Sequence, residues 1–303
     1  MANSPVMTTL PAYVEERRLP LIKEAVLGAK SASMFNLQTD IKTDAVINLL
    51  STDVEFGDGL ACGWDEKGSQ TLSQRTIKTG NFKVNMAYCD KTMLKYWTQY
   101  AVRVAAGQKT LPFEEDFVNA VIADVKAKIE TAIWQGDTAS GDANLKIFDG
   151  LLKIAKADAN INKVDADVTA GAYGAIKAVY MAIPEKVLDG AVIFVGADVY
   201  RKFTNELMEK NLFHYDGKGV DEEIYFPGTN VRVVAVNGLN GTDYIFAARP
   251  QDLFFGCDLV NDEEVFDFFY SKDNREFRLV IEANAGVQYA FSDQIVLGGK
   301  DIA

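Results

Sequence analysis

The chain has 303 residues, of which 48% are hydrophobic and 24% are charged, and its formal net charge is −12. A chain of this length and composition can bury a substantial core, as one large domain or two smaller ones, which excludes a disordered or fibrous protein. The negative charge argues against binding of duplex nucleic acid by the surface as a whole, although a local basic patch stays possible.

Targeting signals and disulfides are not expected. The apolar runs, such as AVIFV at 191–195, are far shorter than the ~20 residues that span a membrane. The first residues lack the basic and apolar regions of a secretory signal, so we expect folding in the cytosol and no contact with a membrane. The three cysteines, Cys62, Cys89 and Cys257, have no metal-ligand spacing, and we expect reduced, structural thiols.

The first predicted element is an arm. Residues 13–29 mix charged and apolar positions and are interrupted by Pro20. Because proline does not fit the interior of a helix, this pattern predicts an extended arm with a helix after it.

A ribbon is predicted next. Residues 51–89 are rich in glycine and contain no proline, and residues 82–88 alternate strictly between apolar and polar side chains. Period two predicts a strand, and the Gly80-Asn81 pair before it predicts a hairpin turn. Leu72 and Ile77, in the preceding polar segment, are out of phase with each other in a period of two residues. Such a ribbon has too little apolar surface to be stable alone, so we expect it to pack on something else.

The strongest helix signal is LPFEEDFVNAVIADVKAKIETAIWQG at 111–136. Acidic residues fill its first turn, and apolar residues recur at every fourth position from Phe117 to Ile133. About 22 residues at ~1.5 Å each predict a rod of roughly 33 Å. Gly136 follows where a C-terminal cap belongs.

Residues 169 to about 256 predict a mixed α/β unit. Helical spacing predicts a helix over 169–183, which Pro184 closes, and Asp198 is expected to cap a second helix. Strands are predicted at 191–195, 231–236 and 244–248, and the loop NGLNGTD between the last two has hairpin chemistry. The tail predicts two long strands, EVFDFFYS and EFRLVIEANAGVQYAFSD.

The loop GDTASGDA at 136–143 shares GxxxxG with phosphate-binding loops. Asp142 and Ala143 stand where Lys and Ser or Thr belong, and the loop follows a helix instead of a strand. As a calcium loop it fails as well, because Ile147 holds the glycine position and Lys153 the closing acid position. The pattern therefore predicts a surface connection.

No other feature of the sequence predicts an active site or a cofactor site. His214 is the only histidine, and Tyr215 and Asp216 could orient it, but a lone histidine in such a loop is more often a surface residue. The 43 acidic residues neither support nor exclude glycoside hydrolysis, and VIFVGADVYRK lacks the glycines of a dinucleotide fingerprint. We predict no catalytic residue, cofactor or metal. Protruding elements bury their apolar side against neighbours, which favours a subunit of an assembly.

Four stretches carry a resemblance: LACGWDEKGSQTLSQRTIKTGNFKVNMAYC, KIETAIWQGD with FDGLL, IYFPGTNVRVVAVNGLNG and NREFRLVIEANAGVQYAF. With their order along the chain, they resemble major capsid proteins of tailed double-stranded DNA phages with the Hong Kong 97-type fold. The similarity is closest to those of phages that infect gut Bacteroidota. It implies an α+β fold with these parts: N-terminal arm 1–50, extended loop 51–89, peripheral domain with spine helix 90–149, α/β axial domain 150–255, and peripheral strands with the C-terminus 256–303.

The resemblance implies pentamers and hexamers that tile an icosahedral shell around double-stranded DNA, without sequence-specific binding. Each extended loop would lie over a neighbour's peripheral domain and spine helix, and the arm would reach an adjacent subunit. The shell would be a virion capsid assembled in the host cytoplasm with separate scaffolding, portal and decoration proteins. The expected contact residues are Trp64, Leu72, Arg75, Ile77, Phe82, Val84, Glu130, Arg17 and Arg18. The expected structural turns are at Gly136, Pro227 and Gly228.

Two departures and two alternatives accompany the resemblance. Some relatives carry a long N-terminal scaffolding segment, whereas the arm of this chain begins within its first residues. We therefore expect that scaffolding is a separate protein or is already absent. Some relatives join subunits through a Lys-to-Asn isopeptide bond; Lys67 or Lys78 could take that role, but the partner residues have no match, so we predict no crosslink. In the same fold, the alternative is an encapsulin that encloses cargo enzymes. In a different class, it is an acid-dependent hydrolase built on the α/β unit.

Overall fold

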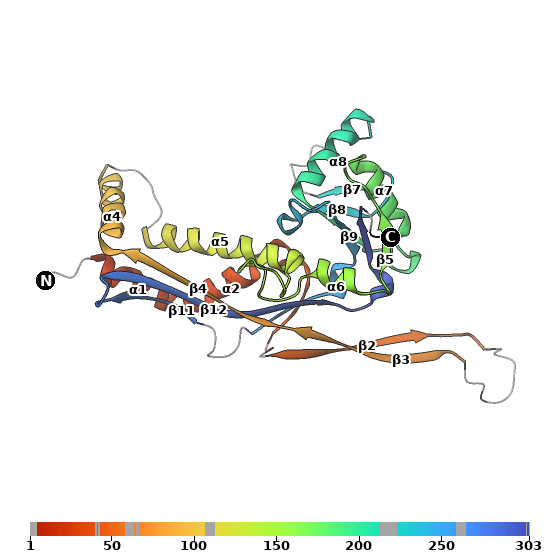
Figure 1. Ribbon diagram of the computed structural model, residues 1–303, viewed down its shortest axis with the longest axis horizontal. Helices are drawn as coiled ribbons and strands as arrows, with labels where there is room; N and C mark the ends of the chain where they lie inside the picture. The colour runs from red at the N-terminus through yellow and green to blue at the C-terminus, as the bar shows by residue number, and fades with distance from the viewer. Residues whose placement is uncertain are drawn as a thin grey trace.

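The computed structural model describes residues 5–39, 41, 43–57, 64, 67–106, 113–212, 223–258, 265–300 and 302. The molecule is elongated (Figure 1), with a helix-covered sheet at one end, a second sheet with its own helices at the other, and a thin ribbon that projects past the second sheet. The short helices η1 Glu185–Val187, η2 Asn237–Leu239, η3 Pro250–Asp252 and η4 Ser292–Gln294 lie in connections.

The N-terminal segment is helical and packs on its own chain. It forms α1 Pro5–Glu16, α2 Arg18–Leu27 and α3 Lys30–Met34. The predicted extended stretch around Pro20 is wrong, because Pro20 lies in the first turn of α2, where a backbone N–H has no partner within the helix. Leu21, Ile22, Ala25 and Val26 are buried in the core that α2 shares with α5.

The projecting ribbon consists of β2 Asp44–Asp53 and β3 Ser69–Lys78, paired antiparallel from Asp44 with Lys78 to Asp53 with Ser69. Only Thr79 separates it from β4 Gly80–Cys89, which pairs with β12 instead. The predicted hairpin at Gly80-Asn81 is therefore wrong: β3 and β4 follow one another and take different partners. The ribbon starts before residue 51 and ends before residue 80, unlike the expected 51–89.

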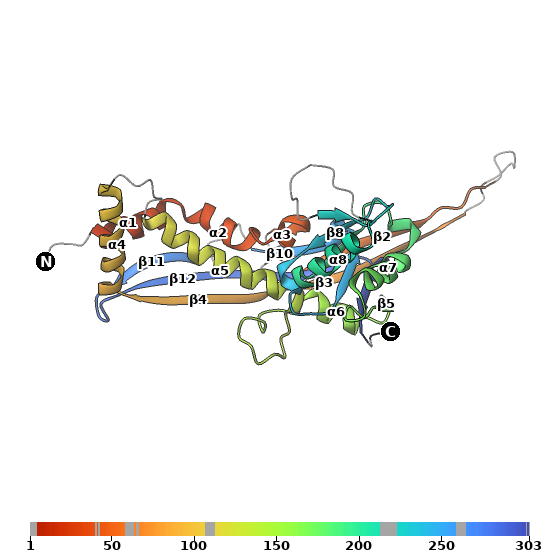
Figure 2. The same cartoon turned by 90° about the horizontal axis from the view of Figure 1, so that it is seen from above.

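The five-stranded sheet has the order β1-β10-β12-β11, and β4 pairs with the other side of β12. Its remaining strands are β1 Asn36–Gln38, β10 Leu253–Cys257, β11 Val265–Ser271 and β12 Glu276–Tyr289. The two long strands predicted for the tail are confirmed. α5 Phe113–Gln135 lies over one face with α1 and α2 (Figures 1 and 2), and its buried stripe confirms the predicted helix. α4 Asp90–Ala105 stands at the far end of this sheet.

The six-stranded sheet has the order β5-β13-β9-β6-β8-β7. Its strands and helices are β5 Asn162–Asp165, β6 Val192–Val195, β7 Glu223–Tyr225, β8 Arg232–Ala235, β9 Ile245–Ala248, β13 Val296–Gly299, α6 Leu151–Ala157, α7 Ala172–Ala182 and α8 Ala197–Glu209. The strand predictions hold, but the hairpin between β8 and β9 is wrong because β6 lies between them. Asp198 is not the cap of α8; Gly196 takes that position and Asp198 lies in the first turn.

Both faces of β6 are buried, which explains why its sequence is wholly apolar. Ile193 and Val195 belong to the core formed with α7 and α8. Val192 and Phe194 belong to the core that includes α5, where the Phe194 ring lies 5.2 Å from the Trp134 ring. Trp134, near the end of α5, therefore joins the two sheets through one continuous core.

A buried carboxylate also fixes α5. Glu130 is 4% exposed, and its two carboxylate oxygens accept hydrogen bonds from the backbone N–H and the hydroxyl of Ser31. The Trp134 indole donates to the same hydroxyl at 2.7 Å. Because buried charges are retained only when hydrogen-bonded, this group ties α3 to α5.

Glu130→Ala is expected to lower the free energy of unfolding by roughly 2 kcal/mol, because it leaves the buried Ser31 donors without their acceptor. Denaturant unfolding followed by circular dichroism measures the loss. Asp124→Ala on the exposed side of α5, which removes only a surface ion pair with Lys128, should cost less than about 0.5 kcal/mol. Equal losses for the two variants would show that the Glu130 carboxylate does not fix α5.

Candidate functional site

No group of three or more His, Cys, Asp and Glu side chains within the described ranges could bind a metal ion. In the same part of the chain, no helix has both the length and the apolar character needed to cross a membrane. His214 and Cys62 lie outside the described residues. The surfaces that remain as candidates are apolar.

The loop after α5 is closed by ion pairs and backbone contacts. Lys153 Nζ lies 2.7 Å from Asp137 and 2.6 Å from Asp149. The hydrogen bond to Lys153 lowers the pKa of Asp137, and the same contacts raise the pKa of Lys153. Both carboxylates are therefore paired with a lysine of the same loop region, in agreement with the expected surface connection.

The outer half of the ribbon is exposed over its whole described length. All described residues from Leu50 to Gly57 and from Lys67 to Gln74, and Trp64, have exposed side chains. Apolar residues are prominent among them: Leu72 is 80% exposed, Phe56 93% and Trp64 94%. An isolated two-stranded ribbon is at best marginally stable in water, so this one is suited to being covered by another surface.

The two faces of the ribbon differ. Leu50 pairs with Leu72, and directly opposed residues share a face, so these two leucines form one exposed apolar pair. Ile47, Leu49 and Ile77 point to the other face and are buried in a small core with Ile41, Phe254 and Ala290. The inner face thus anchors the ribbon to its own chain, and the face of Leu50 and Leu72 is left open.

Arg75 fixes the root of the ribbon. Its guanidinium donates to Asp158 at 2.9 Å and to the Ser292 hydroxyl at 2.6 Å, and lies 4.5 Å from the centre of the Tyr289 ring. The Tyr289 hydroxyl donates to the same Asp158 oxygen at 2.9 Å. Burial alone would raise the pKa of Asp158, but hydrogen bonds from the backbone N–H of Asn160 and from the side chains of Arg75 and Tyr289 lower it to about 2. Burial and the bond to Asp158 raise the pKa of Tyr289.

This network predicts a pH dependence of stability. The pKa of Asp158 is lower in the folded chain than its ordinary value of 3.8, so its contribution is present above pH 3.8 and is lost as the pH falls towards 2. Asp158→Asn should therefore cost roughly 2 kcal/mol of unfolding free energy at pH 7 and little near pH 2. Denaturant unfolding of both proteins at the two pH values checks this. A cost that stays the same at both would contradict it.

A groove lies between β4 and α5. It is a hollow of about 670 Å³ whose lining includes Val84 and Met86 of β4, Phe117 and Val121 of α5, and Ile147 of the following loop. Asp124 and Lys128 add charges to the lining. β4 pairs with β12 on one side, and no strand in the described part of the chain pairs with its other side. The groove thus combines an apolar lining with a free strand edge, features that an extended segment can cover.

The structure separates the expected contact residues into exposed and buried groups. Trp64, Leu72, Arg17 and Arg18 are exposed, and Val84 is half-buried in the groove. Arg75 is held by Asp158 of its own chain. The folded chain itself buries Ile77 and Glu130, which leaves no exposed side chain there for a neighbour. Phe82 is buried as well, but it belongs to the lining of the groove.

The expected turns have clear geometry. Gly136 follows the last residue of α5 but does not have positive φ, so the expected left-handed cap is not its role. Its backbone instead approaches Phe148 and Gly150 closely, and Gly150 N–H donates to the Gly136 carbonyl at 2.9 Å. Pro227 and Gly228 are the central residues of a turn closed by Thr229 N–H and the Phe226 carbonyl, with φ of 74° at Gly228.

Sequence reasoning missed part of the exposed surface. Val46 and Leu50 lie in β2, which was expected to belong to the arm, and Val54 and Phe56 continue the same exposed segment. The short apolar run AVINLL at 45–50, with the β-branched residues Val46 and Ile47, is a weak strand signal that could have extended the ribbon.

Comparison with known proteins identifies solved structures that share this fold. No protein-family model matches the sequence, and no curated protein matches it. A chain of the satellite phage P4 procapsid, whose structure includes the size determination protein Sid, superposes with a TM-score of 0.62 and 13% identity, covering 93% of this chain and 90% of that one. A chain of the capsid of an empty GTA particle gives 0.51 and 12%, covering 91% and 89%. The chain has the Hong Kong 97-type capsid fold.

A third similar structure is a virus-like particle. A chain of a virus-like particle from Pyrococcus furiosus superposes with a TM-score of 0.53 and 8% identity, covering 93% of this chain and 98% of that one. The predicted α+β fold class is confirmed by these similarities and by the two sheets with their helices.

Proposed function

We propose that this chain is a major capsid protein, the subunit that self-assembles into the shell of a tailed phage. The observation that carries the proposal is the ribbon. A chain with the capsid fold leaves Leu50 and Leu72 exposed on two paired strands, and Phe56 and Trp64 exposed in the segment that joins these strands. A surface of this kind is stabilised when it is buried, at ~25 cal/mol for each Å² of apolar area removed from water.

The groove between β4 and α5 is the partner surface that we assign to the ribbon. It offers apolar side chains and a free strand edge, and the ribbon offers an apolar pair and extended backbone. The ribbon projects away from its own groove (Figure 1), so the two surfaces join different copies. Contacts of this head-to-tail type close into rings when the rotation between copies fits, which is how pentamers and hexamers would form.

The parts of the chain take roles in this proposal. The ribbon, Asp44–Lys78, is the extended loop; the five-stranded sheet with α5 is the peripheral domain; the six-stranded sheet with α7 and α8 is the axial domain around the symmetry axes. The helical segment before β1 is the N-terminal arm, which packs on its own peripheral domain. The role is structural, without catalysis.

The partners follow from this role. The shell encloses double-stranded DNA without sequence-specific binding, and the net charge of −12 keeps the protein from holding that DNA tightly. Separate scaffolding, portal and decoration proteins complete the particle, which assembles in the host cytoplasm.

The content of purified particles tests the proposal. The chain is expressed with the other proteins of its phage, and particles are purified, treated with nuclease and analysed for DNA and protein. We expect double-stranded DNA protected from nuclease. Particles filled instead with one cargo protein would indicate an encapsulin.

A further inference from the structure

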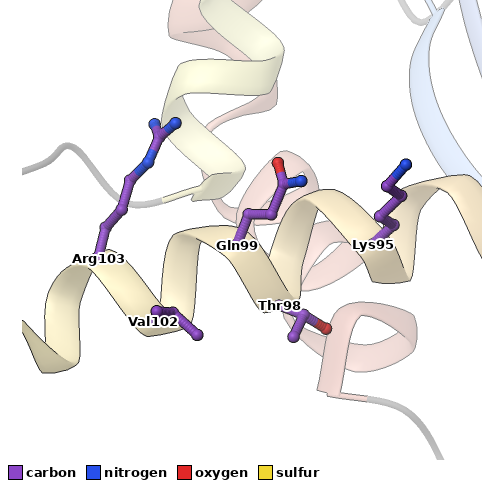
Figure 3. A pocket seen from close by; sticks show the side chains of 5 residues that line it. All are labelled: Lys95, Thr98, Gln99, Val102 and Arg103. Atoms are coloured by element: carbon purple, nitrogen blue, oxygen red, sulfur yellow. The ribbon is translucent and has the colours of Figure 1, made fainter.

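The arginine at the root of the ribbon is held much more firmly than an ordinary surface arginine. Figure 3 shows the side chain of Arg103 projecting from α4 beside a shallow hollow, where it is exposed. The side chain of Arg75 is only 23% exposed. Its guanidinium donates to Asp158 and Ser292 and lies over the ring of Tyr289. Because a planar guanidinium donates hydrogen bonds in fixed directions, these contacts fix the orientation of Arg75 as well as its position.

The hydrogen-bond acceptors of Arg75 lie on two connections that lead into the six-stranded sheet. Asp158 lies between α6 and β5, and Ser292 lies between β12 and β13. β5 and β13 are neighbours in that sheet. We call these two connections, residues 158–161 and 290–295, the neck. Through Arg75 the ribbon is therefore attached to the neck, in addition to the five-stranded sheet on which its root lies.

The attachment to the five-stranded sheet is apolar and close. Gly256 of β10 and Gly286 of β12 are paired, and neither carries a side chain that would hold the ribbon away from the sheet. Ile77 lies against Gly256, and the backbone of Lys78 lies against Gly286. Apolar attraction has no preferred direction, so this attachment fixes the place of the ribbon better than its angle.

Two separate attachments define a direction, whereas one lets the ribbon pivot. Gln288 of β12 donates to the Thr76 carbonyl at 3.0 Å, so this bond belongs to the sheet attachment. Arg75 lies two residues from Ile77, on the same face of the ribbon, and reaches the neck instead. From Arg75 to Ser69 the ribbon continues for about 20 Å, at ~3.3 Å for each residue. A small change of angle at the root is therefore enlarged at the outer end.

We propose that Arg75 is a positioning residue that limits the range of angles at which the ribbon leaves the subunit, and thereby the curvature of the shell. In a head-to-tail contact, the rotation from one copy to the next decides whether a ring closes. A narrow range of ribbon angles admits rings of five and six, and a wide range also admits open sheets. The effect on the shell rests on the proposed shell function, whereas the restraint on the ribbon is a property of the single chain.

Distances within one chain test the restraint. In a background with Cys62→Ser and Cys89→Ser, spin labels are attached at Thr71→Cys on β3 and Lys177→Cys on α7, two exposed positions. Cys257 is buried and is left unchanged. The labelled chain is mixed with a large excess of unlabelled chain. Pulsed dipolar spectroscopy then reports the distance between the two labels of one copy, whether or not the copies have assembled.

With Arg75→Gln, which removes the charged fork, we expect a distance distribution about twofold wider than with Arg75 in place. Lys78→Gln is the matched control, because it removes the same charge from an exposed side chain of β3 and should leave the width unchanged. If Arg75→Gln does not fold, Arg75→Lys, which keeps the charge but not the fork, takes its place. A folded Arg75 variant with a distribution as narrow as that of the control would overturn the restraint.

Particle shape tests the effect on the shell. Electron microscopy of Arg75→Gln expressed with the other proteins of its phage should show particles of mixed diameter and open sheets, and Lys78→Gln should give uniform shells. Uniform shells from an Arg75 variant whose distance distribution is wide would overturn the role in curvature and leave the restraint intact. Failure of the unmodified chain to form shells would overturn the proposed function, while the distance measurement would still decide whether Arg75 restrains the ribbon.

Discussion

Gly136→Val is expected to cost about 3 kcal/mol or more of unfolding free energy and to leave little protein able to assemble. A side chain at this position would collide with the carbonyl oxygens of Phe148 and Ala132, and both are backbone atoms that cannot turn aside. The Gly136–Gly150 contact holds the connection between the end of α5 and α6, so the strain reaches both sheets. Denaturant unfolding and size-exclusion chromatography measure the two effects.

The same loop supplies the control. An added Cβ at Gly141 meets no atom within 4 Å, and Gly141 does not have positive φ, so Gly141→Ala should change stability by less than about 0.5 kcal/mol. If Gly136→Val were as stable as Gly141→Ala, the close approach of the two backbones would not be what ends the spine helix.

Leu72→Asp is expected to abolish assembly while leaving the subunit folded. Leu72 is 80% exposed in the single chain, so a charge there costs the subunit little. In the assembled shell the same charge would be buried against the apolar groove without a partner, which costs far more than the lost apolar contact. Circular dichroism should show an unchanged thermal transition, and electron microscopy should show no closed particles.

Thr71→Asp is the matched control for Leu72→Asp. Thr71 is the preceding residue of β3, is also exposed and points to the opposite face of the ribbon. Assembly should survive this substitution. Normal particles from Leu72→Asp, or an equal loss from both variants, would contradict the assignment of the Leu50 and Leu72 face to the neighbouring subunit.

Elements whose signal is local could be predicted from the sequence. The α5 helix follows from a sustained apolar stripe, and β11 and β12 follow from long β-rich runs. Strand partners could not be predicted, because the pattern within a strand does not specify its neighbour. The sequence around Gly80 has the chemistry of a hairpin, yet β3 pairs with β2 and β4 with β12. The same limit led to the wrong hairpin between β8 and β9, which β6 separates.

The contact surface was predictable only in part for a related reason. An apolar residue in a ribbon can be covered by its own chain or by a neighbour, and the sequence does not distinguish the two. Ile77 is wholly buried within the chain, and Leu72, five residues earlier on the other face, is open. Glu130 was among the expected contact residues, but Ser31 of α3 donates hydrogen bonds to both its carboxylate oxygens.

Copies of this chain are proposed to join through the ribbon into a closed shell, and electron microscopy of particles purified after expression with the phage's scaffolding protein would show whether they do. We expect icosahedral particles in which pentamers and hexamers are resolved and each ribbon lies in the groove between β4 and α5 of an adjacent copy. A protein that stays a folded monomer or dimer under these conditions, with its ribbon free, would show that the ribbon does not join the copies.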